Sequence, residues 1–456
     1  MFLLSFLIYG FRMSAMNCEE ARYSVLPDLK RFDMAKEPTR TRFYLKPIIW
    51  LLSKPAVVSH HVRITKINME DLEKDGVPYL LLCNHNAFMD FKVAAMALWP
   101  RIFSPIVAID GFLGREWLLR SVYAICKRKF TNDSRLIKNI KTVLHNGDIS
   151  VIYPEARYSL CGTTAILPDS LGKMARYLKV PVAVLICHGN HINSPFWALG
   201  DRKVHTEAEM KQILTVEDLK SLNLEEINKR IREAFVYDDF AWQRGNNISI
   251  DYPRRAEGLH KVLYQCPHCK AECLMESKGS RLICKNCSKE WEMDELGVLH
   301  GSDGVTEFSH IPDWYEWERK QVRKEVEEGS YFFEAEGHLM SLPNARKFLE
   351  LGKAYVRHDT SGFLLVGNYK EKRLEVHIPV SAMYSCHIEY EYLGKWGDGI
   401  DLNTIDDTFF FFPNPEKRFS VTKIALATEE LYMHNSAVLS DCLKGNTESM
   451  ETNNII

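Results

Sequence analysis

Short apolar runs alternate with segments of helical periodicity between residues 76 and 190, and this alternation constrains the fold more than any other feature of the chain. Segments 88–98 and 134–145 carry apolar residues at intervals of three and four, as one face of a helix does. Runs that are apolar throughout are typical of strands buried on both faces, with helices covering those faces. The pattern therefore predicts an α/β domain. The apolar runs are 79–83, 103–109, 150–153 and 180–187.

The chain is too long for one such domain, because 456 residues correspond to about three domains of roughly 150 residues each. Lys and Arg number 58, and Asp and Glu number 60, so the formal net charge is −2. This balance removes the whole-chain electrostatic argument for nucleic-acid binding. Hydrophobic residues at 46% and charged residues at 26% are close to the averages of soluble globular proteins. Disorder and a polytopic membrane protein are both disfavoured.

A change of pattern follows the α/β segment. Residues 224–235 predict one more amphipathic helix, and residues 313–328 predict a charged connecting helix. From 331 to 412, short β-type runs are punctuated by Gly, Asn, Asp and Pro, as in a small β barrel or sandwich. An amphipathic helix at 421–433 then completes a pattern that resembles a pleckstrin-homology-like domain. The last residues, rich in Asn, Thr and Ser, favour disorder.

The N-terminal region contains two apolar stretches. Residues 1–11 lack the basic region and the cleavage site of a signal peptide, and eleven residues are too few to span a bilayer. Residues 43–58 are interrupted by Lys46, Pro47, Lys54 and Pro55. This second stretch is either a core helix or a helix suited to the membrane interface.

We therefore expect six parts in the chain. They are an N-terminal segment (1–42), the α/β domain (43–258), a zinc ribbon (259–300), a linker helix (301–330), a β-rich pleckstrin-homology-like domain (331–440) and a disordered tail (441–456).

His85 and Asp90 follow the first predicted strand directly and open the next helix. Ligands usually bind where strands end and helices begin in α/β sheets. If Asn86 caps the helix, Asp90 lies in the first turn, where the helix dipole favours its charge. Its carboxylate can then fix one imidazole nitrogen of His85 and leave the other as a general base, so that the nucleophile comes from a substrate. The alternative is a helix-capping histidine with an incidental aspartate.

A second motif, Tyr153–Ser159, follows another predicted strand at the same kind of sheet edge. The guanidinium of Arg157 suits a phosphate or carboxylate, and Glu155 is placed to position it or to receive a substrate hydroxyl. Upstream, three consecutive cations stand beside a predicted helix end: Lys127, Arg128 and Lys129.

These blocks resemble the glycerolipid (lysophosphatidate-type, 1-acylglycerol-3-phosphate) acyltransferases over about residues 45–240. Residues 84–90 match the family's N-H-x4-D, and residues 123–129 loosely match its arginine-ended second block. Residues 153–159 match F-P-E-G-T-R-S, and residues 180–182 match V-P-[IV]. Two departures concern the third block: Ala156 replaces the usual Gly, and Tyr158 stands at the family's arginine, with Arg157 one place earlier. In the second block the basic residue is either Arg128 or Lys129.

The resemblance implies transfer of an acyl chain from acyl-CoA or acyl carrier protein to the hydroxyl of a lysophospholipid. His85 would remove the hydroxyl proton and Asp90 would stabilise the imidazolium. The thioester is already activated, so no catalytic cofactor is expected. The resemblance also implies a protein bound peripherally to the inner face of the cell membrane. The substrate-binding residues would be Asn84, Lys127, Arg128, Lys129, Glu155, Arg157 and Ser159. His188 and His191 are either further site residues or histidines of the core or a loop.

Five of the 12 cysteines lie between residues 266 and 287, whereas the others are scattered as in a reduced cytoplasmic chain. Two C-x2-C pairs predict a zinc ribbon with a closed, structural Zn²⁺ site of four thiolates. Cys273 and His268 are spare candidates for the fourth ligand. The ligands are Cys266, Cys269, Cys284 and Cys287.

Zinc ribbons often bind nucleic acid, but residues 261–300 hold six basic and six acidic side chains, so we expect no nucleic-acid partner. Two other functions remain open. One is a non-catalytic lipid-binding membrane adaptor, and the other is a zinc-ribbon protein that binds nucleic acid.

Overall fold

The computed structural model describes residues 22–23, 26 and 29–452. The chain forms two compact units. One consists of Phe32–Glu318 and Asn344–Lys347, and the other of Arg319–Pro343 and Phe348–Ile456 with the residues up to Arg31. The division between the units falls inside helix α12 (Ile311–Glu327), close to the connecting helix predicted at 313–328. The N-terminal apolar stretch 1–11 lies outside the described residues.

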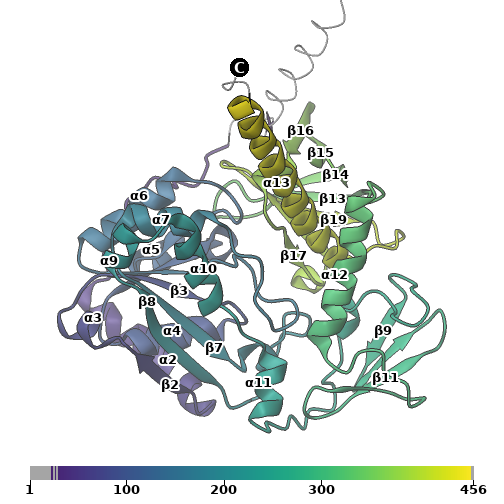
Figure 1. Ribbon diagram of the computed structural model, residues 1–456, viewed down its shortest axis with the longest axis horizontal. Coiled ribbons are helices and arrows are strands. Elements are labelled where there is room, and N and C mark those ends of the chain that lie inside the picture. The colour runs from purple at the N-terminus through teal and green to yellow at the C-terminus, as the bar shows by residue number, and fades with distance from the viewer. Residues whose placement is uncertain (1–21, 24–25, 27–28, 453–456) are drawn as a thin grey trace, which may run out of the picture. The chain divides into compact units, whose positions relative to one another are not determined.

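The first unit is built on a seven-stranded sheet with the order β2-β8-β7-β3-β6-β4-β5. Strands β2, β8, β7 and β3 of this sheet are labelled in Figure 1. From β7 to β5 all neighbours are parallel, whereas β8 runs antiparallel to β7 and parallel to β2. This confirms the α/β fold. The strands are β2 (Arg63–Ile67), β3 (Leu80–Cys83), β4 (Phe103–Ala108), β5 (Ile125–Lys127), β6 (Ile149–Ile152), β7 (Val182–His188) and β8 (Glu207–Leu214).

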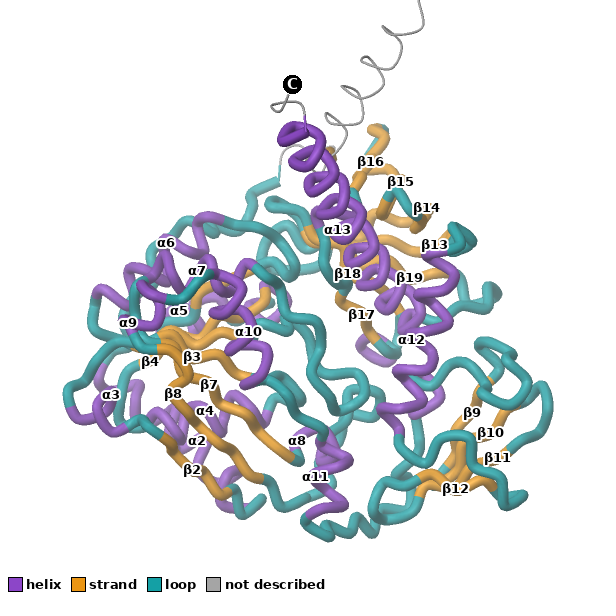
Figure 2. Tube along the Cα trace, viewed as in Figure 1, coloured by secondary structure: helices purple, strands orange, loops and turns teal. Residues whose placement is uncertain are grey.

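Two hydrophobic cores lie on opposite faces of this sheet. Successive side chains of a strand point to opposite faces, so those of β3 enter the two cores alternately. Leu81 packs into one core with side chains of α2, α3 and α4. Leu80 and Leu82 pack into the other with side chains of α6, α7 and α10. Figure 2 shows these three helices near one another beside the strands of the sheet. The helices are α2 (Lys46–Ser59), α3 (Glu70–Lys74), α4 (Met89–Leu98), α5 (Glu116–Ser121), α6 (Ser134–His145), α7 (Ser170–Leu178), α8 (Asn190–Asn193), α9 (Val216–Ser221), α10 (Leu224–Ala234) and α11 (Asp239–Gly245).

A four-stranded antiparallel sheet of order β12-β11-β10-β9 follows in the same unit, and its strands lie in the part of the chain predicted to be the zinc ribbon. The strands are only three or four residues long, so the apolar side chains that they bury, such as Leu282 and Trp291, form a small core. The strands are β9 (Met275–Lys278), β10 (Arg281–Cys284), β11 (Glu290–Met293) and β12 (Leu299–Gly301).

The second unit holds an antiparallel sheet of order β1-β16-β15-β14-β13-β19-β18-β17, followed by helix α13 (Val421–Thr452). The predicted β-rich character and C-terminal helix are present, while the pleckstrin-homology-like assignment stays a prediction. Strand β1 (Arg22–Tyr23) pairs with β16, and nothing in the sequence indicated this pairing. The other strands are β13 (Phe333–Ser341), β14 (Leu349–Asp359), β15 (Gly362–Tyr369), β16 (Lys372–Ile378), β17 (His387–Glu389), β18 (Gly399–Asn403) and β19 (Thr408–Pro413).

Helix α13 continues to Thr452, into the range 441–456 for which the composition predicts disorder. Residues 441–452 contain one glycine and no proline, so polar composition alone does not end the helix. Among the described helices, none combines the length and the apolar character needed to cross a bilayer.

Candidate active site and metal centre

The turn between β3 and α4 carries His85 and Asp90 at the carboxyl edge of the parallel strands. Nδ1 of His85 lies 3.3 Å from Oδ2 of Asp90, and the aspartate side chain is fully buried while the imidazole is 23% exposed. The same carboxylate oxygen accepts hydrogen bonds from the backbone N–H groups of Asn86 (2.6 Å) and Ala87 (2.9 Å). Its other oxygen accepts one from Nδ2 of Asn190 (2.7 Å). Asp90 is thus fixed at both oxygens and can hold His85 in the tautomer that leaves Nε2 as the base.

The start of α4 differs from the expectation that Asn86 caps the helix. The helix begins at Met89, and the preceding residue, Phe88, makes no side-chain cap. The Asp90 carboxylate binds the free N–H groups of the turn instead. The side chain of Asn86 is therefore available for another contact, and its Oδ1 lies 3.1 Å from the hydroxyl of Tyr237.

Two tyrosines of the third motif pack against the imidazole of His85. The ring centroid of Tyr153 is 4.3 Å from that of His85, and that of Tyr158 is 4.4 Å away. Tyr158 occupies the position at which the resembling family has an arginine. An aromatic ring therefore lies beside the candidate base where that family has a cation.

The side chain of Glu155, in the third motif, connects that motif to the turn that carries His85. Its Oε2 accepts from the backbone N–H of His85 (2.7 Å), and its Oε1 accepts from that of Ala165 (2.8 Å) and from the hydroxyl of Tyr237 (3.1 Å). Burial raises the pKa of Glu155 to about 7, although these hydrogen bonds and the charge of Arg157 oppose the shift. Through its contact with the backbone N–H, Glu155 positions the turn that carries His85, and a contact of Glu155 with substrate stays a prediction.

Two residues predicted to bind substrate, Asn84 and Ser159, make buried hydrogen bonds within the protein, and their contact with a substrate stays a prediction. The amide of Asn84 is buried and bonds to both the N–H (2.8 Å) and the carbonyl (2.9 Å) of Cys187, which ties the ends of β3 and β7 together. The Ser159 hydroxyl is also buried, and it donates to the carbonyl of Thr163 (2.6 Å). The backbone N–H of Ser159 donates to the carbonyl of His85 (2.8 Å), so the third motif directly contacts the first.

The predicted cations lie at two places on the same sheet edge. Arg157 is buried within the third motif. Its positive charge lies close enough to Glu155 to offset part of the rise in the pKa of that carboxyl. The cluster Lys127–Lys129 is at the end of β5, and β6 and β4 separate that strand from β3. At about 4.8 Å per strand, this places it roughly 14 Å from the strand that carries His85. Burial lowers the pKa of Lys127, and Lys129 pairs with Asp110 (3.1 Å).

Three side chains that sequence reasoning missed support the site from residues 189–240. Asn190 and Tyr237 bond to Asp90, Asn86 and Glu155 as described, and Asp239 accepts from the backbone N–H of His191 (3.0 Å) beside Asn190. Burial raises the pKa of Asp239 to about 8. None of the three belongs to a motif, so the sequence carried no signal for them.

The two histidines near β7 belong to the packing around the site. The ring of His191 is fully buried against Trp197 and Phe240, and burial lowers its pKa to about 3. The ring of His188 stacks on Trp242. Both observations favour the interpretation as core or loop histidines.

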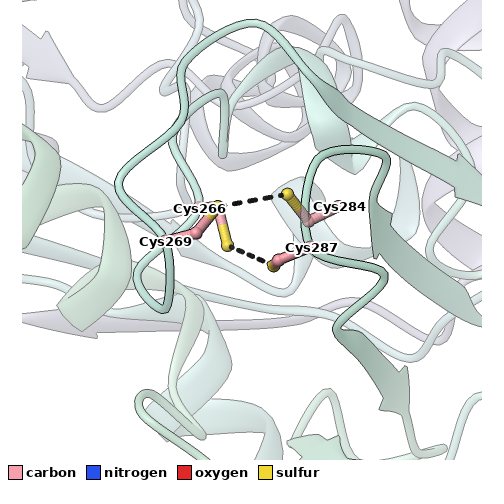
Figure 3. A group of neighbouring side chains, drawn as sticks. All are labelled: Cys266, Cys269, Cys284 and Cys287. Atoms are coloured by element: carbon pink, nitrogen blue, oxygen red, sulfur yellow. Dashed lines mark hydrogen bonds between the residues drawn. The ribbon is translucent and has the colours of Figure 1, made fainter.

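The four predicted zinc ligands converge, as Figure 3 shows. The sulfur atoms of Cys266 and Cys287 are 3.8 Å apart, and those of Cys269 and Cys284 are 3.7 Å apart. Four sulfurs at about 2.3 Å from a tetrahedral Zn²⁺ would be separated by about 3.8 Å, so the arrangement fits the ion. The distances are far beyond the roughly 2.05 Å of a disulfide.

The two C-x2-C turns share one backbone geometry. The carbonyl of Cys266 accepts from the N–H of Lys270 (2.9 Å), and that of Cys284 accepts from the N–H of Ser288 (2.8 Å). Burial would raise the pKa of Cys269, but hydrogen bonds led by that of Asn286 outweigh it and lower the pKa to about 6. The spare candidate Cys273 is outside the four-sulfur group, and His268 contacts Glu307 (3.2 Å).

Residues 63–187 match the family model described as Acyltransferase. The chain thus carries an acyltransferase domain, and this range contains both motifs that meet at His85. Among solved structures, the chain is similar to the 1-acyl-sn-glycerophosphate (LPA) acyltransferase PlsC from Thermotoga maritima. The TM-score is 0.32 and the sequence identity 16%, and the similarity covers 42% of this chain and 79% of that chain. No curated protein matches the chain.

We predict that Asn190→Ala lowers the turnover of acyl transfer about tenfold or more, because one oxygen of the buried Asp90 loses its charged hydrogen bond. Steady-state kinetics would measure the loss, with Asn228→Ala as control because Asn228 bonds to Gly172 and Asp169, away from Asp90. Unchanged turnover in Asn190→Ala would show that the backbone N–H groups suffice.

We also predict that Ala156→Gly raises the free energy of unfolding by up to about 1 kcal/mol. Ala156 has a φ of +55°, a left-handed conformation that glycine adopts without the Cβ cost. Urea denaturation would measure the change. The matched substitution Ala175→Gly in the interior of α7 should lower stability, and an equal response of the two variants would contradict the strain at Ala156.

Cys284→Ser should remove one equivalent of bound zinc and lower the thermal unfolding temperature, because metal binding stabilises a segment with little core. Elemental analysis of the purified chain measures the zinc. Cys273→Ser is the control and should retain it. Loss of zinc in both variants, or a wild-type chain without zinc, would contradict the four-cysteine assignment.

Proposed function

We propose that this chain is a peripheral membrane O-acyltransferase that moves a fatty acyl chain from acyl-CoA or acyl carrier protein to the hydroxyl of a lysophospholipid, with 1-acylglycerol-3-phosphate as acceptor. Nε2 of His85 takes the hydroxyl proton while the alcohol oxygen attacks the thioester carbonyl. The C–S bond then breaks, and the thiolate leaves with the proton that His85 returns. Asp90 stabilises the imidazolium between these steps.

One observation carries the proposal: a fully buried carboxylate, fixed at both oxygens, lies 3.3 Å from Nδ1 of a partly exposed histidine. The Glu155 side chain supports this pair by binding the backbone N–H of the histidine. A base held in this way can act on a hydroxyl brought by a substrate, since no nucleophilic side chain is needed in the pair itself.

The acceptor assignment rests on the cations at the same sheet edge. The motif that carries Arg157 contacts the His85 turn directly through the Ser159 N–H. A guanidinium at that place suits the phosphate of a lysophospholipid. The cluster Lys127–Lys129 is farther along the edge and would add a positive field rather than a contact beside the reacting hydroxyl.

The membrane assignment rests on the outer face of α2. Ser53 and Val57 are buried against the domain, whereas Ile48, Leu51 and Leu52 are exposed on the opposite stripe, with Leu52 at 72%. An apolar outer stripe flanked by lysines suits the headgroup region of a bilayer.

A cavity of about 520 Å³ adjoins the N-terminal end of this helix. Trp117, which is 80% exposed, stands at the cavity. The lining carries three cations and one carboxylate, which favours anionic lipid. The charged residues are Lys36, Arg42, Arg120 and Glu116.

The test is thiol release from acyl-CoA and from acylated carrier protein with a panel of lysolipids. His85→Ala should lower the rate about 10²–10⁴-fold, the range expected for loss of a general base. His145→Ala, at the exposed end of α6, is the matched control and should retain the wild-type rate. Zinc content should be equal in all three proteins.

Three outcomes would contradict the proposal. Turnover retained by His85→Ala would exclude the mechanism. Lipid that copurifies with a wild-type chain that releases no thiol from either donor would indicate a lipid-binding adaptor. Salt-sensitive binding to DNA or RNA, again without thiol release, would indicate a nucleic-acid-binding protein.

A further inference from the structure

A second convergence of metal-ligating side chains occurs in the β-rich unit, on strands β17 and β18. His387 and Glu389 are two residues apart on β17, so their side chains project from the same face. The register places Asp401 of β18 directly opposite His387. The backbone pairing alone therefore brings one imidazole and two carboxylates together.

The ligand atoms of these side chains are close to one another. Nε2 of His387 is 3.1 Å from Oε1 of Glu389 and 3.8 Å from Oδ2 of Asp401, and all three ligand atoms lie within 4.8 Å of one another. The Asp401 side chain is 1% exposed, and that of Glu389 is 14% exposed. The group is thus largely buried, with its most accessible member at Glu389.

We propose that His387, Glu389 and Asp401 form a binding site for a divalent first-row transition ion, separate from the four-cysteine centre. Donors at about 2.1 Å from such an ion are separated by about 3.0–3.5 Å at adjacent positions, so adjustments of a few tenths of an ångström to about 1 Å would complete the geometry.

The donor set selects the class of ion. One nitrogen and two carboxylate oxygens suit Mn²⁺, Fe²⁺ or Zn²⁺, whereas the four thiolates of the ribbon select softer ions. Three protein ligands leave coordination positions for water, as in sites that are open on one side. Mn²⁺ is therefore a probe that distinguishes the two centres, because thiolates bind it poorly.

The site would fasten the end of the sheet. Strand β17 is three residues long, and among the described strands it lies at the edge of the sheet and pairs with β18. Three register pairs hold it, and the 390–398 connection contains two glycines with positive φ, Gly394 and Gly397. A metal bridge between the two strands would restrict the opening of this hairpin more than three ladder pairs do.

The simpler interpretation is a hydrogen-bonded trio, with a histidine between two acids and no ion. Both interpretations predict that the residues stabilise the hairpin, so stability alone does not separate them. Direct counting of bound metal does.

The experiment uses the full zinc-loaded chain and Mn²⁺, with free Mn²⁺ measured by electron paramagnetic resonance. We expect one equivalent to bind to the wild type. Glu389→Gln and Asp401→Asn should weaken binding about tenfold or more, as expected for damage to a metal site. Glu371→Gln, an exposed acid in the turn between β15 and β16, is the matched control and should bind normally.

Circular dichroism would confirm that the variants are folded. Glu389→Gln provides the decisive comparison if Asp401→Asn fails to fold, because Glu389 is the least buried of the three. A wild-type chain that binds no Mn²⁺, or Glu389→Gln with wild-type binding, would overturn the proposal and leave the hydrogen-bonded trio.

Discussion

The site depends on the fixation of one buried carboxylate. Asp90 replaces the water it loses on burial with hydrogen bonds from two backbone N–H groups of its own turn and from the amide of Asn190. Because the backbone donors belong to the residues that follow His85, the same contacts shape the turn and aim the carboxylate at the imidazole. The hydrogen bonds that fold this turn are therefore the same ones that orient the candidate base.

Residues beyond the range matched by the family model complete this arrangement. Asn190 and Tyr237 reach back to Asp90, Asn86 and Glu155, and Glu155 in turn holds the backbone of His85. The candidate base is thus supported by two chains of hydrogen bonds, one through each carboxylate. The hydrogen bonds that support the His85–Asp90 pair therefore extend past residue 187, at least to Tyr237.

The sequence predicted those parts of the fold and of the site that depend on residues close to one another in the chain. The buried strands β3, β4, β6 and β7 and the helices α4, α6 and α10 follow from apolar periodicity, and His85 and Asp90 are five residues apart in one turn. The half-exposed strand β2 has no such pattern, and β5 is too short to show one. Asn190 is 100 residues from Asp90, so only the packing of β7 beside β3 could reveal that contact. The first motif drew attention to Asn84, but the motif alone did not show that the amide of Asn84 bonds to the backbone of β7.

The tyrosine rings around His85 bear on the charge that this histidine would carry during a reaction. The face of an aromatic ring is electron-rich, and it attracts a cation within about 6 Å. The rings of Tyr153 and Tyr158 lie 4.3 and 4.4 Å from the imidazole, inclined to it by 34° and 52°. An arginine in place of Tyr158 would add a like charge at the moment when the imidazole becomes positive. Tyr158 brings no such charge, so a neutral aromatic ring packs against the imidazole at the position where the family pattern has a cation.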